Sequence, residues 1–445
     1  MGNYEAYLAY KTSGVEWLGE IPSHWEVKRL KNIATYNDES LPETTDPDFE
    51  LEYVEISNVD LVDGITSSES ITFEKAPSRA RRKVRDGDTI ISTVRTYLKA
   101  IAAVRNPPAN MIVSTGFAVI RPKENLHPNY VGYLLQCEGF IGNVVAYSTG
   151  VSYPAINASL LAALPAIDPP LPEQEAIARF LDNKTAQIDG LIAKKEALLA
   201  RLADKRTALI SQAVTKGLDP RVPMRDSGVE WLGEIPSHWV TNRLKWSVTQ
   251  CKNGVWGDEP DGENDLVCLR VADFDRQSFT VGTDKLTMRG ITPKDRRDRL
   301  LSKGDLLLEK SGGGEQQLVG TVVYFDHEFE AVTSNFVARM PPVETVNGRF
   351  LSYVHAHLYS GHVNYRSIKQ TTGIQNLDSQ QYLNEVIAYP PLYEQEAIAH
   401  FLDKQTEMYY HQTAKIQAAI GKLKEYRTAL ITGAVTGKID VRGVV

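Results

Sequence analysis

Basic side chains gather in one stretch of the first half of the chain. Residues 71–105 include nine basic and three acidic residues, and the stretch before them, 37–63, holds ten acidic residues and no basic one. Lysine and arginine at this density are typical of phosphate binding, for which the local field matters more than the net charge of −7. The alternative is a solvated surface, because charge runs usually lie on exposed faces.

Residue patterns for catalysis are incomplete. Segments 106–109 (NPPA) and 168–171 (DPPL) lack the aromatic residue that completes the Asn/Asp-Pro-Pro-aromatic tetrapeptide of amino-methyltransferases, so we interpret both as proline turns. Residues 312–314 (GGG) are not followed by the Gly-Lys-Ser/Thr of a phosphate loop. His355 and His357 are two residues apart on an expected helix and do not share a face, which disfavours a metal site. No nucleophile–base pair stands out, and we expect a chain that binds rather than catalyses.

Two long amphipathic helices must position whatever the rest of the chain binds. Segments 172–217 and 394–438 both carry a stripe with alternating steps of three and four residues, the seam of a coiled coil. The first stripe runs through Ala178, Leu181, Thr185, Ile188, Ile192, Lys195, Leu199, Leu202, Arg206, Leu209 and Ala213. The second runs through Ala399, Leu402, Thr406, Tyr409, Thr413, Ile416, Ile420, Leu423, Arg427, Leu430 and Ala434. About 44 residues at 1.5 Å each give a helix of roughly 65 Å, and we expect the two copies to cover each other.

The chain is an internal duplication. The sequence SGVEWLGEIPSHW occupies residues 13–25 and returns, letter for letter, at 227–239. We interpret Trp25 and Trp239 in these segments mainly as core residues. Weaker echoes pair Gly87-Asp88 with Gly304-Asp305, Phe117 with Phe336, Tyr133 with Tyr353, and Thr149-Gly150 with Thr372-Gly373. Elsewhere the two interiors differ strongly.

Short apolar runs between turns predict strands in both halves. The runs are 89–94, 101–104 and 111–120 in the first half and 266–271, 305–309, 318–325 and 336–340 in the second, with helices near 129–137 and 349–357. The predicted fold class is α+β (mixed α/β): two globular domains separated by a long two-helix coiled coil, with a pseudo-two-fold repeat. A compact domain of about 165 residues has a radius of gyration near 15 Å and cannot easily carry the chain back along the rod, so we expect the helices to run antiparallel.

The predicted domain boundaries follow from these elements. They are a first domain at 1–170, a first long helix at 171–217, a linker at 218–226, a second domain at 227–391, a second long helix at 392–438 and a tail at 439–445. Three cysteines without CxxC spacing argue against a disulfide framework and a zinc site and fit a reducing cytoplasm. We expect a cytoplasmic protein with no membrane partner, because no run of 18 apolar residues and no signal pattern is present.

This layout resembles the specificity (S) subunit of type I restriction–modification systems. The residues that carry the resemblance are the Tyr10-Lys11 to Trp25 segment, its repeat at 227–239, and the PPLxEQEAIAxFLD segments that begin at Pro169 and Pro390. The resemblance implies that each domain is a target recognition domain for one half of a split double-stranded DNA site and that the helix pair sets the gap. It implies a non-catalytic chain that docks two methyltransferase (M) subunits and restriction (R) subunits. It further implies no cofactor in this chain, with S-adenosylmethionine, ATP and Mg expected in the partners.

Matching the family pattern places candidate DNA contacts in loops after the Gly-Asp strands and in nearby basic runs. In the first domain they are Arg79, Arg81, Arg82, Lys83, Arg85, Arg95, Tyr97, Lys99, Ser152 and Tyr153. In the second they are Arg289, Lys294, Arg296, Arg297, Arg299, Lys310, Gln316, Gln317, Gln375 and Asn376. Arginine pairs with guanine and glutamine or asparagine with adenine, whereas lysine mostly holds phosphate. The alternatives are a two-headed coiled-coil scaffold that binds no DNA and an enzyme with an unrecognised site.

Overall fold

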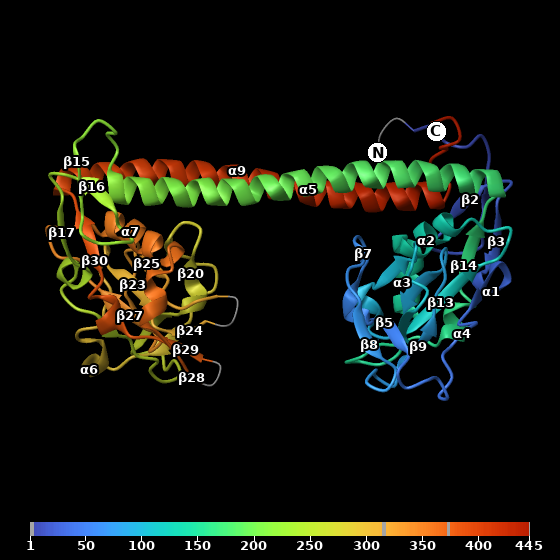
Figure 1. Ribbon diagram of the computed structural model, residues 1–445, viewed down its shortest axis with the longest axis horizontal. Coiled ribbons are helices and arrows are strands. Elements are labelled where there is room, and N and C mark those ends of the chain that lie inside the picture. Colours follow the sequence, from blue (N-terminus) through green and yellow to red (C-terminus); the bar gives the residue numbers. More distant parts are fainter. Residues whose placement is uncertain (1–3, 314–316, 372–373, 445) are drawn as a thin grey trace. The chain divides into compact units, whose positions relative to one another are not determined.

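The computed structural model describes residues 4–313, 317–371 and 374–444, and the chain divides into two compact units (Figure 1). Unit 1 comprises Met1–Lys194 with Ala419–Val445, and unit 2 comprises Lys195–Ala418. Two long helices, α5 (Leu171–Lys216) and α9 (Leu392–Val435), each contribute one part to each unit. Each unit is therefore a mixed α+β domain packed on a stretch of helix pair, and the predicted fold class is confirmed.

The two long helices run antiparallel within each unit. In unit 1, Nε of Arg427 on α9 lies 2.9 Å from Oδ1 of Asp189 on α5, while Glu173 at the start of α5 lies 3.8 Å from Arg442, beyond the end of α9. In unit 2, Gly217 follows the last residue of α5 at φ 76° and lies against the ring of Trp239. That ring is in turn bonded to Glu394 at the start of α9. The expected antiparallel arrangement is thus confirmed in both units.

Unit 1 is built from two main sheets and several short ones. One main sheet has the order β11 (Ile101–Ala103), β10 (Thr89–Ser92), β13 (Phe117–Pro122), β4 (Ala34–Tyr36). The other has the order β8 (Glu69–Thr72), β5 (Glu50–Val54), β12 (Met111–Ser114), β9 (Ala80–Lys83). Short pairs are β1 (Tyr10–Thr12) with β2 (Glu20–Pro22), β3 (Glu26–Arg29) with β14 (Pro165–Asp168), and β6 (Val59–Asp60) with β7 (Gly64–Ile65). The shorter helices are α1 (Leu30–Ile33), α2 (Pro128–Gln136), α3 (Glu138–Ala146) and α4 (Ala158–Leu161).

Unit 2 repeats this plan with changes at the edges. Its main sheet has the order β18 (Lys252–Asn253), β27 (Val337–Met340), β23 (Leu306–Glu309), β25 (Val322–Tyr324), β21 (Thr280–Val281), β20 (Phe274–Asp275). The others are β22 (Met288–Gly290), β19 (Asp265–Leu269), β26 (Ala331–Thr333), and β24 (Ser311–Gly312), β29 (Ile374–Leu377), β28 (Ile368–Thr371). Short pairs are β15 (Met224–Asp226) with β16 (Glu234–Pro236), and β17 (Val240–Arg243) with β30 (Val386–Tyr389). The shorter helices are α6 (Pro293–Arg296), α7 (Gly348–Ser360) and α8 (Ser379–Tyr382).

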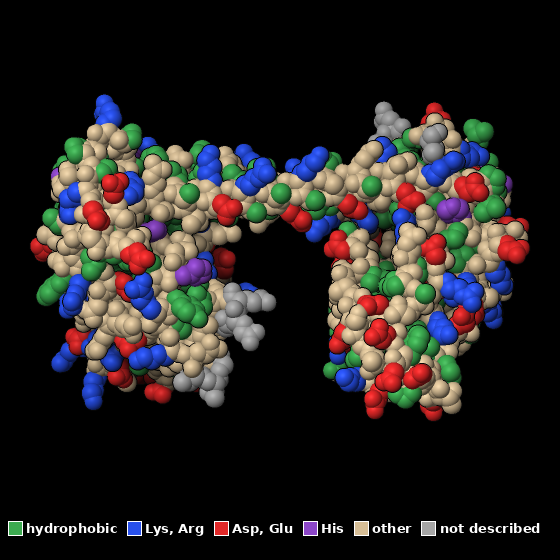
Figure 2. Space-filling view, viewed as in Figure 1, with side chains coloured by type: hydrophobic (Ala, Val, Ile, Leu, Met, Phe, Trp, Pro, Cys, Tyr) green, Lys and Arg blue, Asp and Glu red, His purple; other side chains and the backbone are tan. Residues whose placement is uncertain are grey.

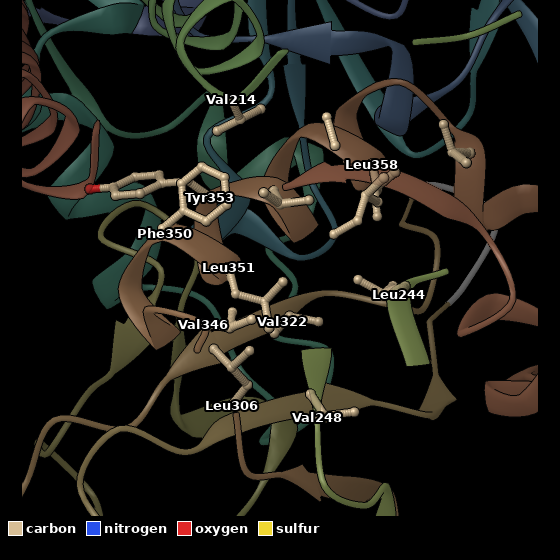
Figure 3. Packing of buried hydrophobic residues seen from close by; sticks show 14 of the residues in the cluster. Val214, Leu244, Val248, Leu306, Val322, Val346, Phe350, Leu351, Tyr353 and Leu358 are labelled. Atoms are coloured by element: carbon tan, nitrogen blue, oxygen red, sulfur yellow. The ribbon is translucent and has the colours of Figure 1, made fainter. Parts of the chain in front are cut away.

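The core of unit 2 joins the long helices to its main sheet. Val214 of α5 and Ile398 of α9 belong to one buried cluster with Phe350 of α7 and Leu306 of β23, part of which Figure 3 shows. The apolar face at one end of each long helix takes part in this cluster, through Ile210, Ala213 and Val214 of α5 and Ile398, Ala399 and Leu402 of α9. The sheet that carries the candidate loops is therefore fixed to the helix pair by direct packing.

The sequence segments that repeat between the halves form the same hydrogen-bonded clasp twice. Trp25 Nε1 donates to Glu173 at 2.9 Å in unit 1, and Trp239 Nε1 donates to Glu394 at 3.0 Å in unit 2. Both indoles are almost fully buried, with 0% and 1% of their surface exposed, so their predicted core role is confirmed. A charged carboxylate that holds a buried N–H makes a strong bond, and the repeated SHW and EQE motifs fix the start of each long helix to its domain.

The next residue of each long helix holds the domain's own helix. Gln174 accepts from the backbone N–H of His127 at 2.8 Å, and Gln395 accepts from that of Asn347 at 2.9 Å. His127 and Asn347 are the cap residues of α2 and α7, whose first N–H groups have no partner inside the helix. The glutamine is thus a second clasp between each long helix and the helix beneath it.

The strand register shows that one of the expected residue correspondences between the two halves is wrong. Thr93 donates its backbone N–H to Gly116 and Lys310 donates to Phe336, so Phe336 corresponds to Gly116 and not to Phe117. Phe117 is buried with 1% exposed, whereas Phe336 is 51% exposed. The predicted strand at 111–120 also divides at Thr115 and Gly116, because β12 pairs in one sheet and β13 in the other.

Two other echoes are confirmed by their contacts. Asp88 binds Arg121 at 2.8 Å and Asp305 binds Arg339 at 2.6 Å, each directly after a glycine with positive φ. The hydroxyls of the paired tyrosines donate to equivalent aspartates of the long helices, at 2.8 Å in unit 1 and 2.7 Å in unit 2. The echo at Thr372-Gly373 lies outside the described residues.

Candidate nucleic-acid interface

The loop after β10 in unit 1 has an unusual backbone. Arg95 and Lys99, which bracket the short turn at Thr96–Leu98, have φ 51° and 55°. This left-handed region favours glycine, and other residues that adopt it concentrate at functional sites because the surrounding structure must hold them there. Tyr97 at the tip is 52% exposed. The loop therefore presents basic and aromatic side chains on a constrained backbone.

A second loop is fastened beside the first. Val94 and Ala155 form a β-bridge, and the hydroxyls of Thr96 and Ser148 lie 2.8 Å apart. The Arg95 guanidinium lies over the ring of Tyr153, 4.7 Å from its centroid.

The two loops of unit 1 therefore form one surface, hereafter the double loop. It brings together the candidates Arg95, Tyr97, Lys99, Ser152 and Tyr153. Cationic and aromatic groups of this kind hold phosphates and stack on bases.

The basic run on β9 is partly neutralised by the acidic stretch before it. Arg79 pairs with Glu55, and Arg85 pairs with Glu39 at 2.5 Å. Figure 2 shows basic and acidic side chains interspersed over the visible face of this unit. These pairs account for much of the local charge contrast that the sequence displays.

Other residues of the run have no carboxylate partner within the described ranges. The Arg81 guanidinium lies 4.5 Å from the centre of the Phe73 ring. Arg82 contacts Ser40, and its Nε is buried without a hydrogen-bond partner in the described part of the chain. Burial lowers the pKa of this guanidinium from its usual value. Arg81, Arg82 and the half-buried Lys83 are thus the cations of β9 that an added phosphate could pair with.

In unit 2 the equivalent double loop is a small sheet. Ser311 of β24 pairs with Asn376 of β29, and the Ser311 hydroxyl donates to the Asn376 side chain at 2.6 Å. Gln375 is buried with 4% exposed, and its Oε1 accepts from the Val319 N–H at 3.1 Å. Asn376 therefore lies exposed on this surface, while the Gln375 carboxamide holds the loop.

Gln317 and Gln316 are the remaining glutamine candidates of unit 2. Gln317 lies beside Arg276. When the Gln317 carboxamide is oriented with its oxygen toward Arg276, that oxygen accepts a hydrogen bond from Arg276 Nε at 2.8 Å. Arg276 also binds the buried Glu309 at 3.0 Å. Gln316 lies outside the described residues.

The basic candidates of unit 2 differ in their surroundings. Lys310 and Arg299 both bind Asn253, at 3.0 Å through its side chain and 3.2 Å through its carbonyl, and so come together near the double loop. Arg296 binds Asn264 at 3.2 Å. Lys294 and Arg297 are exposed on and after α6.

Arg289 is the most buried of the basic candidates in unit 2, with 9% exposed. It binds Glu259 and lies 4.7 Å from the centroid of Trp256. Trp256 and Phe336, both largely exposed, were not among the candidates. The sequence signal for Trp256 was a tryptophan near glycines in a polar segment. Phe336 was missed because it had been matched to the buried Phe117.

The described residues offer neither a cluster of metal ligands nor a membrane-spanning helix. Within residues 4–313, 317–371 and 374–444, no three His, Cys, Asp or Glu side chains are grouped as metal ligands. In the same ranges no helix is long and apolar enough to cross a membrane. His355 is fully buried, with its Nδ1 2.7 Å from the Tyr382 hydroxyl, and belongs to the core.

Comparisons with known proteins agree with this geometry. The family model for the type I restriction modification DNA specificity domain matches residues 22–200 and 282–420. The specificity subunit of the type I restriction enzyme StySPI of Salmonella potsdam is 22% identical over 326 residues, which are 73% of this chain and 68% of that protein. The specificity subunit of the MjaIX enzyme of Methanocaldococcus jannaschii is 23% identical over 438 residues, 95% of each.

Solved structures share the fold. A chain from a study of complex assembly and conformational transition of the type I R-M system matches with a TM-score of 0.71 and 22% identity, over 93% of this chain and 98% of that one. The HsdS subunit from Thermoanaerobacter tengcongensis matches with a TM-score of 0.51 and 23% identity, over 96% and 100%. Because the family model covers most of the residues in both halves, this chain belongs to the family of type I restriction–modification DNA specificity subunits.

Proposed function

We propose that each unit reads one half of a bipartite double-stranded DNA target, and that the helix pair sets the distance between the two halves. The observation that carries this proposal is the double loop, which occupies the same topological place in both units with different side chains. Unit 1 presents Arg95, Tyr97 and Tyr153 there, and unit 2 presents Ser311 and Asn376. A common frame with different polar groups is what two readers of different sequences require, because base edges are told apart by their donors and acceptors.

The chain itself supplies recognition and no bond chemistry. Methyl transfer and ATP-driven cleavage belong to two M subunits and to R subunits, which bring S-adenosylmethionine, ATP and Mg. Its family membership supports action in a complex with other subunits and DNA. The incomplete DPPL and NPPA segments support the division of labour, since neither ends in the aromatic residue that stacks on a flipped base.

Exchange of one domain tests the proposal. Residues 13–170 are replaced by the first domain of another family member, and the DNA sequence bound is determined by selection from a randomised duplex pool. One half-site should change and the other should stay. A change in both halves, or in neither, would show that the units do not read independently.

Salt dependence gives a second test against a scaffold that binds no DNA. Phosphate contacts release counterions, so the logarithm of the binding constant should fall linearly with the logarithm of salt concentration. A chain that shows no salt-sensitive retardation of duplex DNA, alone or with M subunits, is not a DNA reader.

A further inference from the structure

Unit 2 contains a hollow directly beside its double loop. Its volume is about 510 Å³, and its walls include Trp256, Val271, Gly312, Ser334, Asn335 and Phe336. These residues come from four separate segments, one of which is β24 of the double loop. The hollow thus belongs to the surface that we assign to DNA, and nothing in the family comparison gives it a ligand.

Two aromatic rings stand exposed at this hollow. Trp256 is 41% exposed and Phe336 is 51% exposed. Arg289 stacks on Trp256 and also donates to the backbone carbonyls of Trp256 and Gly257, each at 3.2 Å. The tryptophan is therefore held in place before any ligand arrives. Preorganised exposed aromatics bind flat or methyl-bearing groups at low entropic cost.

The polar side of the hollow offers hydrogen-bonding groups. Ser334 is 2% exposed, and its hydroxyl has no hydrogen-bond partner among the residues that the structure describes. That hydroxyl oxygen is itself closed to solvent, so a group seated in the hollow does not reach it. The exposed Asn335 lies next to it and can donate and accept. The hollow thus combines an apolar wall with the Asn335 carboxamide and with the guanidinium of Arg270, which is paired with Asp273 at 3.0 Å.

Unit 1 has different side chains at the corresponding place. Gly116 stands where unit 2 has Phe336, and a Cβ there would lie 2.8 Å from Ile56. The adjacent surface is taken by the Arg79–Glu55 ion pair. In unit 2 the residue equivalent to Glu55 is Arg270, which lines the hollow and is paired with Asp273, so the two units carry opposite charges at this place.

We propose that this hollow takes the C5-methyl edge of a pyrimidine, a thymine in the half-site read by unit 2. In the major groove thymine shows a methyl group beside its O4 acceptor, whereas cytosine shows an N4 donor and no methyl. The methyl group packs between Trp256 and Phe336, and O4 accepts from the Asn335 side-chain amide. The inference rests on the proposed function, because it names the chemistry by which one reader selects a base.

The test uses the full chain in complex with its M subunits and a target selected from a randomised duplex pool. Each thymine of the half-site read by unit 2 is replaced in turn by deoxyuridine, which removes only the methyl group. One replacement should weaken binding about fourfold, the amount expected for one buried methyl or methylene group. Cytosine at that position should weaken binding further, and 5-methylcytosine should recover only the part due to the methyl group.

Variants of the hollow complete the test. Phe336→Ala and Trp256→Ala should abolish the preference for thymine over uracil, and Phe336→Leu should keep part of it. Trp246→Ala, which removes a 62% exposed tryptophan elsewhere in unit 2, should leave the preference intact.

A specific target with no methyl-sensitive thymine in that half overturns this inference alone. So does an unchanged preference in Phe336→Ala and Trp256→Ala. Failure to select any target overturns the proposed function and the inference with it.

Discussion

Charge pairing distinguishes arginines that look alike in the sequence. Arg79 and Arg85 have carboxylate partners in Glu55 and Glu39, whereas Arg81 stacks on Phe73. The basic run was visible in the sequence, but its neutralisation was not, because each carboxylate lies far upstream and meets its arginine only through the fold. Sequence reasoning therefore found the basic patch and could not rank its members.

Salt titration can rank them. Arg81→Ala with Arg82→Ala should weaken DNA binding and flatten the salt dependence, by about 0.9 in slope for each lost phosphate contact. The matched double variant Arg79→Ala with Arg85→Ala removes two arginines that are already paired with acids and should change the slope less. Equal slopes for the two double variants would show that intramolecular pairing does not decide which arginines reach phosphate.

A buried histidine gives unit 2 a pH dependence. Burial lowers the pKa of His355 to about 3, whereas an unfolded histidine titrates near 6.5. As the pH falls from 6.5 toward 3, this histidine binds a proton in the unfolded chain but stays neutral in the folded chain. Stability that is fully present above pH 6.5 is therefore lost through this window, by up to about 1.4 kcal/mol per pH unit.

The variant His355→Gln should reduce that loss. Glutamine cannot take up the proton and can still bond to Tyr382, so the free energy of unfolding of unit 2 should fall less between pH 6.5 and 4.5. Urea unfolding at a series of pH values, followed by hydrogen exchange in α7, measures it. His411→Gln, on an exposed histidine of α9, should match the unchanged protein. Identical pH profiles for His355→Gln and the unchanged protein would contradict the assignment.

At the scale of elements, the sequence patterns predicted helices and strands but not the order of the strands in the sheets. Three-four spacing gave the long helices, because it follows from which face is buried, and short apolar runs gave β10 to β13, β19, β23, β25 and β27. The other, mostly shorter strands were not predicted. The patterns could not give the sheet orders, in which β9 is present in unit 1 and a strand equivalent to it is absent from the described part of unit 2. Strand neighbours depend on long-range pairing that local patterns do not encode, and the one-residue error at Phe336 arose in the same way.

Removing the glutamine clasp of one unit should destabilise that unit and leave the other unchanged. Gln174→Ala leaves the His127 N–H and the Pro169 carbonyl without partners and should destabilise unit 1 by about 2–6 kcal/mol, since each buried unsatisfied group costs about 1–3 kcal/mol. Gln395→Ala should do the same to unit 2. Hydrogen exchange of α2 and α7 reports the two separately, and Gln187→Ala, exposed on α5, is the control. Loss of protection in both units from one variant would mean that the clasps do not act locally.

At the scale of the whole molecule, the duplicated segments are those that hold each domain to the helices, and the differing segments are those that face DNA in our proposal. The SHW and EQE motifs make the same contacts in both units, while the double loops carry different side chains. The sequence repeat alone predicted this division, because fixed contacts require fixed residues on both sides. It could not show the hollow at Phe336, which depends on the register of two strands.

The helix pair offers a direct test of what sets the spacing between half-sites. Insertion of one heptad into each helix, after Ala193 and after Ala414, keeps the apolar seam in phase and lengthens each helix by about 10 Å. That length is close to three base pairs at about 3.4 Å each, so the gap between the selected half-sites should grow by about three base pairs. Three base pairs also turn the duplex by roughly 100°, at about 10.5 base pairs per turn, whereas a heptad turns the coil by only about 20°. Binding to the longer site should therefore be weaker, because the DNA must twist or the domains must swing to restore the register.

Selection from a randomised duplex pool measures the gap. Inserting the heptad into α5 alone is the control, and it should abolish binding by mismatching the helices. Full-affinity binding of the doubly extended chain to the original site would show that the helices do not set the spacing.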